Sequence, residues 1–173
     1  MIKLIAAVGD KGLLGLIKDG AHTLPWDIKE DMKHFSESTK GAVVIMGRTT
    51  WESLPLKFRP LPGRENIVLT RNTDFVAEGA RVFTSLPEAL SSAGSFEKDI
   101  WIIGGASVYK EALPFVDELS LTSVLEETLP PLEEGFEKVL FPEYKNVFEC
   151  IETSEYVESE GGTYRFETWR RIR

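Results

Sequence analysis

The sequence predicts an α/β fold, in which one domain over residues 1–173 is built on a mostly parallel central β-sheet with helices on both faces and an antiparallel hairpin at the carboxyl-terminal edge. Short runs rich in Val, Ile and Leu alternate along the chain with helical patterns, an order typical of parallel sheets. Several of these runs lack polar residues at alternate positions, as strands covered on both faces do. A chain of 173 residues is long enough for one core and short for two.

The predicted elements follow one another in a βαβα order. Strands are expected at residues 2–8, 42–46, 66–70, 81–83, 100–103 and 119–124, and helices at residues 28–39, 49–53, 86–92 and 108–113. Residues 147–157 and 163–170 alternate polar and apolar side chains around a glycine-containing turn, which predicts the edge hairpin. Residues 126–138 hold two prolines, a glycine and five glutamates, and we expect them to form an exposed loop without a core of its own.

The charge of the chain limits its partners. The net charge of −8 argues against a general nucleic-acid binder and against a polybasic membrane-surface protein, because both need clustered cations. The apolar stretch at residues 4–8 is interrupted by Asp10 and Lys11, too soon for a signal-peptide core or a membrane span. We therefore expect a cytoplasmic protein that binds small molecules. We expect it to be a monomer, and a dimer stays open.

The few cysteine and histidine residues give no metal or disulfide pattern. Cys150 is the only cysteine, so no intramolecular disulfide forms, and this suits a reducing compartment. His22 and His34 are too far apart for a helical metal-binding pair. No metal site is expected, and no Ser-His-Asp order or Cys-His pair indicates covalent catalysis.

One acid stands at the edge of an apolar helix face. Asp27 is the expected N-cap of the helix at residues 28–39. At the helical period Ile28, Met32 and Phe35 share one stripe, and Asp31 falls on its edge. A buried carboxylate is costly without a partner, so an inward-facing Asp31 would meet a polar group or a ligand. The alternative is an edge residue that reaches water or caps a neighbouring loop.

Two strand ends carry glycine followed by a helix start. Residues 100–109 form a buried strand, the pair Gly104-Gly105 and a helix, and glycine lets the backbone approach a phosphate closely. Residues 43–50 repeat this arrangement with Arg48 after Gly47, and Arg71 follows a third strand. Because ligands of open α/β sheets gather at the carboxyl ends of strands, these groups together could clamp a ligand with several phosphates. Each arginine taken singly is also compatible with a surface salt bridge.

A Pro-Gly turn places a further arginine. Arg64 follows Pro62-Gly63, and a guanidinium there could hold a carboxylate in a two-pronged pair. A plain surface turn is the alternative.

Seven segments carry a resemblance to a known family, in this order along the chain: residues 24–26 (LPW), Asp31 with Phe35, 44–53 (VIMGRTTWES), 61–64 (LPGR) with Asn66, 103–105 (IGG) with Val108 and Tyr109, 121–122 (LT) and 141–142 (FP). Nearly from end to end, the chain resembles dihydrofolate reductase. The resemblance implies a single α/β domain and an enzyme that transfers a hydride from NADPH to 7,8-dihydrofolate. The product, 5,6,7,8-tetrahydrofolate, would supply one-carbon metabolism and thymidylate and purine synthesis.

The resemblance also implies a role for each matching residue. The catalytic group would be Asp31, Thr122, Trp26 and Leu24, with Asp31 bonding the pterin ring and helping to deliver a proton through water. The substrate-binding set would be Ile5, Asp31, Phe35, Leu54, Arg59, Leu61, Arg64 and Thr122. The NADPH-binding set would be Ala7, Leu14, Gly15, Gly47, Arg48, Thr49, Thr50, Leu69, Thr70, Arg71, Ile103, Gly104, Gly105, Ala106, Ser107, Val108 and Tyr109. Residues 13–26 would be a mobile loop that closes over the nicotinamide.

Three stretches depart from the family pattern. The loop at 15–24 carries additional residues 18–22 (KDGAH), residues 56–58 (LKF) expand the segment before Arg59, and the acidic segment 126–138 is longer than usual. They leave open which acidic residue touches the closing loop. Two alternatives also stay open: an NADPH-dependent reductase of another pterin- or pyrimidine-like substrate, and a non-catalytic NADPH-binding protein. A nucleotide kinase is disfavoured, because no GK[ST] phosphate loop is present.

Overall fold

A computed structural model describes all 173 residues, and an eight-stranded sheet organises them. The strand order is β10-β11-β8-β1-β7-β4-β5-β6. The bounds are β1 (Ile2–Gly9), β4 (Val43–Gly47), β5 (Glu65–Leu69), β6 (Arg81–Phe83), β7 (Ile100–Ile102), β8 (Glu118–Val124), β10 (Phe148–Thr153) and β11 (Tyr164–Arg171). Neighbouring strands in the part of the sheet ordered β8-β1-β7-β4-β5-β6 pair in parallel, and β11 pairs antiparallel with both β8 and β10. The predicted α/β fold and its antiparallel edge are confirmed.

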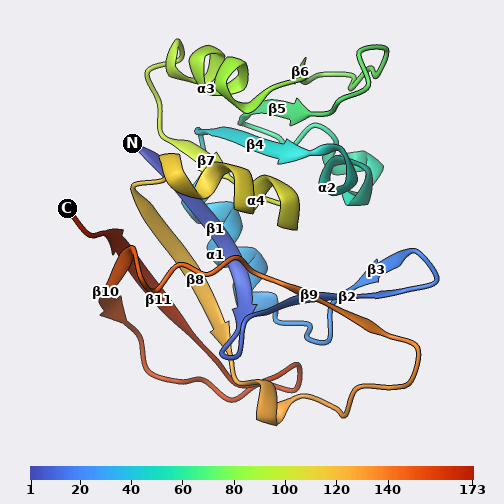
Figure 1. Cartoon of the computed structure of the whole chain (residues 1–173), viewed down its shortest axis with the longest axis vertical. Helices are drawn as coiled ribbons and strands as arrows, with labels where there is room; N and C mark the ends of the chain where they lie inside the picture. The colour runs from blue at the N-terminus through green and yellow to red at the C-terminus, as the bar shows by residue number, and fades with distance from the viewer.

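Helices cover both faces of this sheet, as Figure 1 shows with α4 in front and α1 behind. The helices are α1 (Lys29–Thr39), α2 (Arg48–Ser53), α3 (Leu86–Gly94) and α4 (Ala106–Ala112), with short 3-10 turns η1 (Leu56–Phe58), η2 (Leu113–Phe115) and η3 (Glu126–Thr128). Leu4 on β1 belongs to the core cluster under α3 and α4, whereas the adjacent Ile5 belongs to the cluster that includes Trp51 of α2. Neighbouring residues of a strand point to opposite faces, so β1 is buried on both sides. No helix is both long enough and apolar enough to cross a membrane.

A second, three-stranded sheet corrects two predictions. Strands β3 (Ala21–Thr23), β2 (Leu13–Lys18) and β9 (Glu137–Leu140) pair in the order β3-β2-β9. The prediction of a loop at residues 13–26 is therefore wrong, because most of that segment is a hairpin. The segment 126–138 begins with η3 and runs into β9, so it is not loop throughout, although most of its side chains are exposed.

The sequence contained one signal for this hairpin, an Asp-Gly pair, that the prediction did not use. Asp19 and Gly20 connect β2 to β3 with φ angles of +50° and +79°. Asp-Gly with two positive φ angles is a preferred two-residue hairpin turn. The pairing of β2 with β9 carries no such local signal, because the two strands lie more than a hundred residues apart in the sequence.

The start of α1 also differs from the prediction. The helix begins at Lys29, the N-cap position is Ile28 in an extended conformation, and no side chain caps it. Ile28 is buried, while Asp27 is exposed and its backbone lies against Gly161, where an added Cβ would stand 1.9 Å from the Asp27 carbonyl oxygen. Burial of Ile28 and this close backbone contact set the chain direction, so Asp27 is not the helix cap.

Candidate functional site

The contact between α1 and β8 brings together two residues that lie far apart in the sequence. Thr122 is buried on β8, and its hydroxyl donates a hydrogen bond of 2.6 Å to Oδ1 of Asp31 on α1. Asp31 is half-buried, and its second oxygen accepts no hydrogen bond from the protein. Burial raises the pKa of the Asp31 carboxyl, and the Thr122 hydroxyl and His34 act in the opposite direction. The result is a partly satisfied acid that can still bind or protonate a ligand.

Apolar side chains stand next to this acid. Phe35, one helical turn after Asp31, packs in the same core cluster as Ile5, Leu54 and Leu61. Met32, predicted on the same apolar stripe, is 64% exposed, so the stripe is only partly covered by the protein. An open apolar wall beside a carboxylate suits a flat, partly polar ring.

Trp26 adds a polar atom to the same part of the protein. Its side chain is buried in the cluster that holds Leu16 and Ile28, yet its indole Nε1 donates to no acceptor. An unpartnered buried donor is costly, so water or a ligand is its expected partner. Leu24, also predicted at the site, is 57% exposed. Ala7 lies opposite Thr122 in the ladder between β1 and β8.

The two arginines predicted for the substrate tail have different surroundings. Arg64 donates to Thr39 Oγ1 at 3.0 Å and to the Pro62 carbonyl at 2.9 Å, and its guanidinium lies 5.9 Å from the Phe35 ring. Arg59 instead donates to the carbonyls of Glu52 and Leu54, at 2.7 Å and 2.8 Å. Arg64 therefore lies next to Phe35 of the apolar wall, and Arg59 is hydrogen-bonded to the backbone at the end of α2.

The two glycine turns meet at the carboxyl edge of the sheet. The Gly47 amide donates to the Gly104 carbonyl at 2.8 Å, so the ends of β4 and β7 are joined. Gly104 has a φ of +123°, and an added Cβ would lie 3.2 Å from Tyr109 Oη and 3.4 Å from Thr50 Oγ1. The Tyr109 hydroxyl in turn donates to the Ile5 carbonyl at 2.8 Å. This backbone cradle requires glycine, and it connects the predicted cofactor turn to the substrate-side strand.

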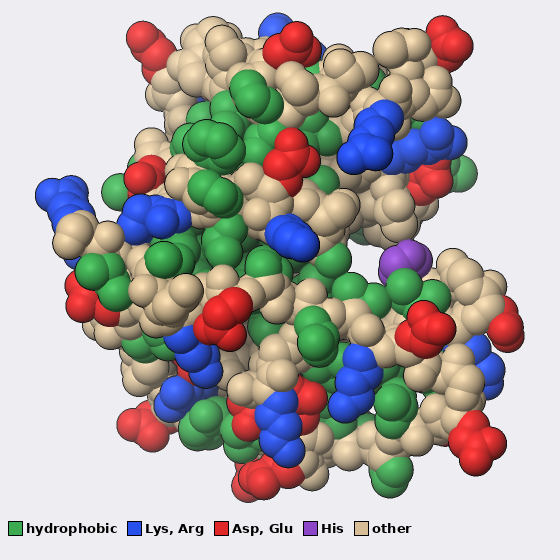
Figure 2. Space-filling model, in the orientation of Figure 1, with side chains coloured by type: hydrophobic (Ala, Val, Ile, Leu, Met, Phe, Trp, Pro, Cys, Tyr) green, Lys and Arg blue, Asp and Glu red, His purple; other side chains and the backbone are tan.

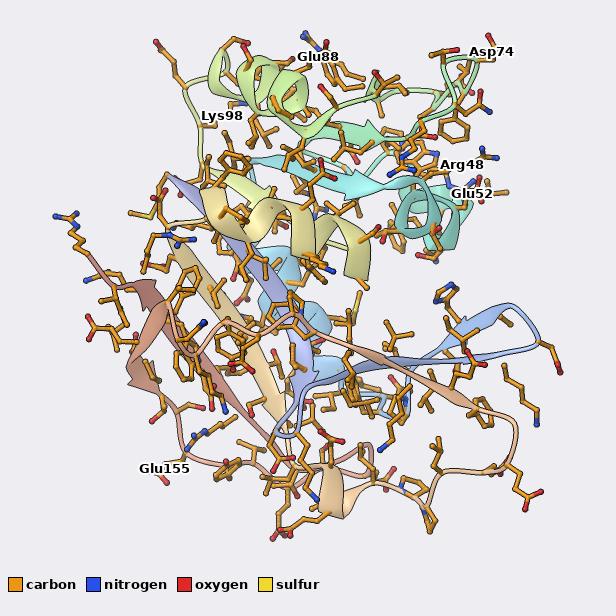
Figure 3. The ribbon with its side chains drawn as sticks, in the orientation of Figure 1. Arg48, Glu52, Asp74, Glu88, Lys98 and Glu155 are labelled. Carbon is orange, nitrogen blue, oxygen red and sulfur yellow. The ribbon has the colours of Figure 1, made fainter.

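The other predicted cofactor residues lie at the same edge or on the adjoining helices. Gly47 is opposite Leu69 in the β4–β5 ladder, which brings Arg48 and Arg71 to neighbouring strand ends. Arg48 pairs with Glu52 at 2.6 Å (Figure 3), and Arg71 is exposed. Thr49 and Thr70 flank these arginines, Ile103 directly follows β7, and Ala106, Ser107 and Val108 begin α4. In Figure 2 the surface is indented between α2 and the β2–β3 hairpin, and Lys and Arg side chains gather on the α2 side.

Glu126 was missing from the predicted site residues. Its carboxylate Oε2 accepts hydrogen bonds from the amides of Lys11 at 2.6 Å and Leu13 at 3.4 Å, and its own amide donates to Asp10 Oδ1 at 2.8 Å. An added Cβ on Gly9 would lie 2.4 Å from the same carboxylate. The acidic segment thus holds the start of the β2–β3 hairpin, on which the predicted Leu14 and Gly15 lie. Only the long-range fold reveals this contact.

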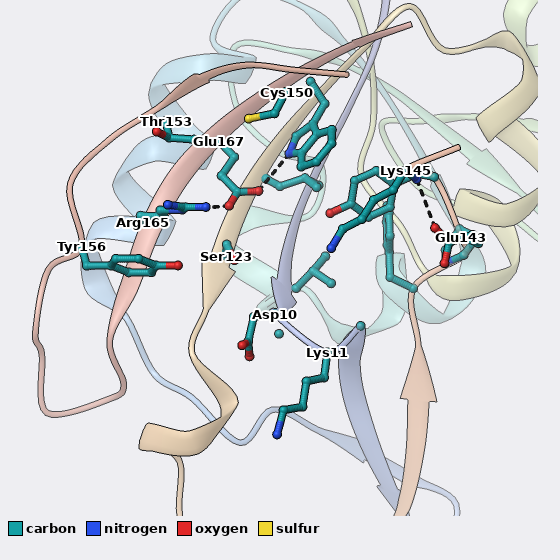
Figure 4. A pocket seen from close by; sticks show the side chains of 18 residues that line it. Asp10, Lys11, Ser123, Glu143, Lys145, Cys150, Thr153, Tyr156, Arg165 and Glu167 are labelled. Carbon is teal, nitrogen blue, oxygen red and sulfur yellow. Dashed lines mark hydrogen bonds and ion pairs between the residues drawn. The ribbon is translucent and has the colours of Figure 1, made fainter. Parts of the chain in front are cut away.

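A separate cavity lies elsewhere in the protein. It measures about 630 Å³ and lies on the face of β8 and β11 that does not carry Thr122. The strands line it through Leu121, Ser123, Arg165, Glu167 and Trp169, and residues 8–12 and 141–145 also line it (Figure 4). Because side chains alternate along a strand, Thr122 and Phe166 point away from it. The cavity is separated from Asp31 by the sheet.

A glycine turn, a half-buried acid and an apolar wall that includes Phe35 are the features expected of a reductase that takes a nucleotide cofactor and a ring substrate. Comparison with known proteins identifies the family. The family model for dihydrofolate reductase matches residues 1–171. The dihydrofolate reductase of Mycobacterium tuberculosis (strain H37Rv) is 47% identical over 124 residues, covering 72% of this chain and 71% of that protein. The enzyme of Neisseria gonorrhoeae is 39% identical over 167 residues, covering 95% and 94%.

A solved structure agrees with these relatives. Dihydrofolate reductase from Enterococcus faecalis, complexed with NADP(H) and RAB-propyl, superposes with a TM-score of 0.82 at 35% identity, covering 100% of this chain and 97% of that chain. The chain belongs to the dihydrofolate reductase family and is an oxidoreductase. The resemblance drawn from the sequence motifs is confirmed.

Proposed function

We propose that this protein reduces 7,8-dihydrofolate to tetrahydrofolate with NADPH, with Asp31 as the acid that binds the pterin ring. The observation that carries the proposal is the half-buried Asp31 carboxylate, held by Thr122 at 2.6 Å with one oxygen free of protein donors. A charged hydrogen bond that this oxygen accepts from the amidine-like N–H edge of a pterin is worth about 1.5–3 kcal/mol and also fixes the orientation of the ring.

Proton delivery is assigned to the same group. Its raised pKa lets Asp31 take a proton from solvent at a pH closer to neutrality than an exposed aspartate does. The unpartnered Trp26 Nε1 would donate to a water molecule that relays the proton to the ring nitrogen. Thr122 keeps the carboxylate in place. Phe35, Ile5 and Leu54 would pack the rings, and Arg64, beside Phe35, would pair with the carboxylate of the substrate tail.

The glycine cradle fits a dinucleotide cofactor. An added Cβ at Gly47 would lie 3.1 Å from Val108, and one at Gly104 would lie 3.2 Å from Tyr109, so both turns need glycine, and their backbone would face the pyrophosphate. NADPH would supply the hydride, and the protein supplies position and electrostatics. Arg48 and Arg71 would hold the 2′-phosphate, with Thr49 beside them. The β2–β3 hairpin, docked by Glu126, would cover the nicotinamide and exclude water.

The test is NADPH oxidation followed at 340 nm with and without dihydrofolate. We expect an absorbance loss that depends on dihydrofolate and collapses in Asp31→Asn, while Glu30→Gln, an exposed neighbour on the same helix, keeps its rate. NADPH binding without dihydrofolate-dependent oxidation would reject the proposal in favour of another reducible ring or a binding role.

Cofactor choice is tested separately with Arg48→Ala and Arg71→Ala. Loss of a charged contact to the 2′-phosphate should weaken NADPH binding by roughly 10-fold or more and leave NADH binding nearly unchanged. Arg81→Ala, an exposed arginine on β6, is the matched control. Equal losses for both cofactors would remove the arginines from the phosphate site.

We also propose that one chain, acting as a single domain, suffices for activity in the cytoplasm. Every residue named for the site comes from the same chain. Light scattering at assay concentrations should therefore give a mass near 19.4 kDa, and the specific activity should not depend on enzyme concentration. A mass near twice that value with concentration-dependent activity would contradict this.

A further inference from the structure

A second contact between α1 and β8 runs beside the Asp31–Thr122 hydrogen bond. His34 follows Asp31 by three residues, and its Nε2 lies 2.9 Å from Ser120 Oγ, a hydrogen bond for which the hydroxyl can donate or accept. Ser120 and Thr122 are two residues apart on β8 and share one face. Residues three apart on a helix also share a face. The helix and the strand are thus joined by two adjacent side-chain bridges.

The His34 ring is held from another side as well. It stacks on Phe166 of β11 with ring centroids 4.4 Å apart and planes inclined by 28°. Phe166 lies opposite Thr122 in the β8–β11 ladder. The imidazole is therefore fixed against the same pair of strands that holds the Asp31 carboxylate, and it cannot turn away without losing both contacts.

The charges around His34 come from α1 alone. Burial lowers the pKa of His34, while Asp31 and Glu37 on its own helix act to raise it, and Lys33 pairs with Glu37. β8 contributes the neutral hydroxyls of Ser120 and Thr122. β11 contributes Phe166 and Tyr164, and burial raises the pKa of the Tyr164 hydroxyl. Arg165 and Glu167 of the same strand point to the opposite face of the sheet. Asp31 is thus the nearest titrating partner inside the site.

We propose that His34 is a positioning residue for Asp31, which it anchors through Ser120 when neutral and holds in the ionised form when it becomes protonated in acid. The proposal rests on the proposed role of Asp31 as the proton-delivering acid. Since burial moves the pKa of Asp31 up and that of His34 down, the two titrations approach each other and are coupled. Loss of the imidazole should therefore let Asp31 hold its proton up to a higher pH.

The experiment is single-turnover hydride transfer from NADPH to dihydrofolate, measured from pH 5 to pH 9. His34→Gln keeps a polar group that can reach Ser120, and His34→Phe keeps the stacking on Phe166. Both should move the midpoint of the pH profile upward by roughly half a unit, because the positive charge that favours the ionised carboxylate is lost. Lys33→Gln, which removes an exposed cation from the same helix, should leave the midpoint in place.

Unchanged midpoints in both His34 variants, with wild-type turnover intact, would overturn the inference. Absence of dihydrofolate reduction by the wild-type protein would instead overturn the proposed function, so the two failures are distinguishable. A second measurement covers the case in which the variants fold poorly. The chain has only two histidines, so NMR titration of the imidazoles resolves His34 from the exposed His22. Asp31→Asn must lower the pKa of His34 and leave His22 unchanged; an unchanged His34 would also overturn the inference.

Discussion

Two buried or half-buried carboxylates occupy opposite faces of the same pair of strands, and they differ in how well the protein satisfies them. Asp31 packs against the face of β8 and β11 that carries Thr122 and Phe166, and it accepts one hydrogen bond, from a neutral hydroxyl. Glu167 lies on the other face, 7% exposed, and accepts from Arg165 Nε and Trp169 Nε1, both at 2.9 Å (Figure 4). The acid with a free oxygen can serve a ligand, and the acid with both oxygens bonded stabilises the fold.

This difference is the reason why we propose the substrate site at Asp31 and not at the 630 Å³ cavity. Glu167 borders that cavity, but its charge is already neutralised by Arg165 and its oxygens are occupied. Asp31 keeps an unsatisfied oxygen beside an apolar wall. A ligand can form a hydrogen bond with a polar atom that has no protein partner, and a large cavity does not by itself provide such an atom.

The largest effect should come from Asp31→Asn. The variant keeps the shape of the side chain but removes the charge and the proton carrier, so we expect hydride transfer at neutral pH to fall roughly 10²- to 10⁴-fold. Stopped-flow single turnover measures this step directly. Glu167→Gln should change the same rate less than threefold, and a comparable loss in both variants would erase the distinction between the two acids.

Glu167→Gln should act on stability instead. It removes the buried anionic partner of the half-exposed Arg165 guanidinium and of Trp169 Nε1, and we expect the free energy of unfolding to fall by about 1–2 kcal/mol. Urea unfolding at pH 7 tests this, with Glu149→Gln on the neighbouring β10 as the exposed control, expected within about 0.5 kcal/mol of wild type. A variant as stable as the control would show that Glu167 is dispensable to the fold.

The pH dependence of stability should reveal Asp31 as a destabilising group. Its folded-state pKa is raised above the ordinary aspartate pKa of 3.8, so between these two pKa values the folded state binds more protons than the unfolded state. The contribution of Asp31 to stability is therefore lost as pH rises through this window. Relative to wild type, Asp31→Asn should gain unfolding free energy over the same window and then level off. Urea titrations from pH 4 to pH 7.5 measure the difference, and a gain that shrinks with rising pH would contradict the sign.

The smallest effect is expected at a third acid, Glu126. Replacing it by Gln removes the charge that accepts from the Lys11 and Leu13 amides but keeps one carbonyl oxygen for them. Since the contact is only partly buried, we expect NADPH binding to weaken by about 3- to 10-fold through looser docking of the hairpin. Fluorescence titration with NADPH gives the affinity. Glu127→Gln, exposed on the same turn, should bind like wild type.

The sequence alone predicted most of the parallel half of the protein. The strands around Val44, Ile67 and Ile102 are continuous apolar runs, and burial on both faces selects such runs directly. The turns at Gly47 and Gly104 could also be predicted, because glycine between a strand and a helix start marks a place where the backbone comes close to a ligand or to a neighbouring segment. Local chemistry was enough in each case.

The start of α1 shows where local signals mislead. Asp27 has the residue type of an N-cap, but its backbone is in close contact with Gly161, which is more than a hundred residues away in the sequence. The next residue, Ile28, is buried in the core. The strand β2 shows a similar effect, because its partner β9 comes from the acidic segment near the other end of the chain. Capping and strand propensity are worth about 1 kcal/mol each, so burial and pairing override them.

From the sequence we could predict the class of fold, the glycine turns and the position of Asp31 at the edge of an apolar helix face, since each depends on neighbours along the chain or on a motif. The way in which these parts meet follows from the folded chain. The tertiary structure set Thr122 and His34 beside Asp31, tied Arg59 to the end of α2, and gave Glu167 its two partners on the far face of the sheet. The physical reason is that hydrogen-bond satisfaction and desolvation depend on contacts between distant segments, and these contacts determine which of two similar carboxylates is free to bind a ligand.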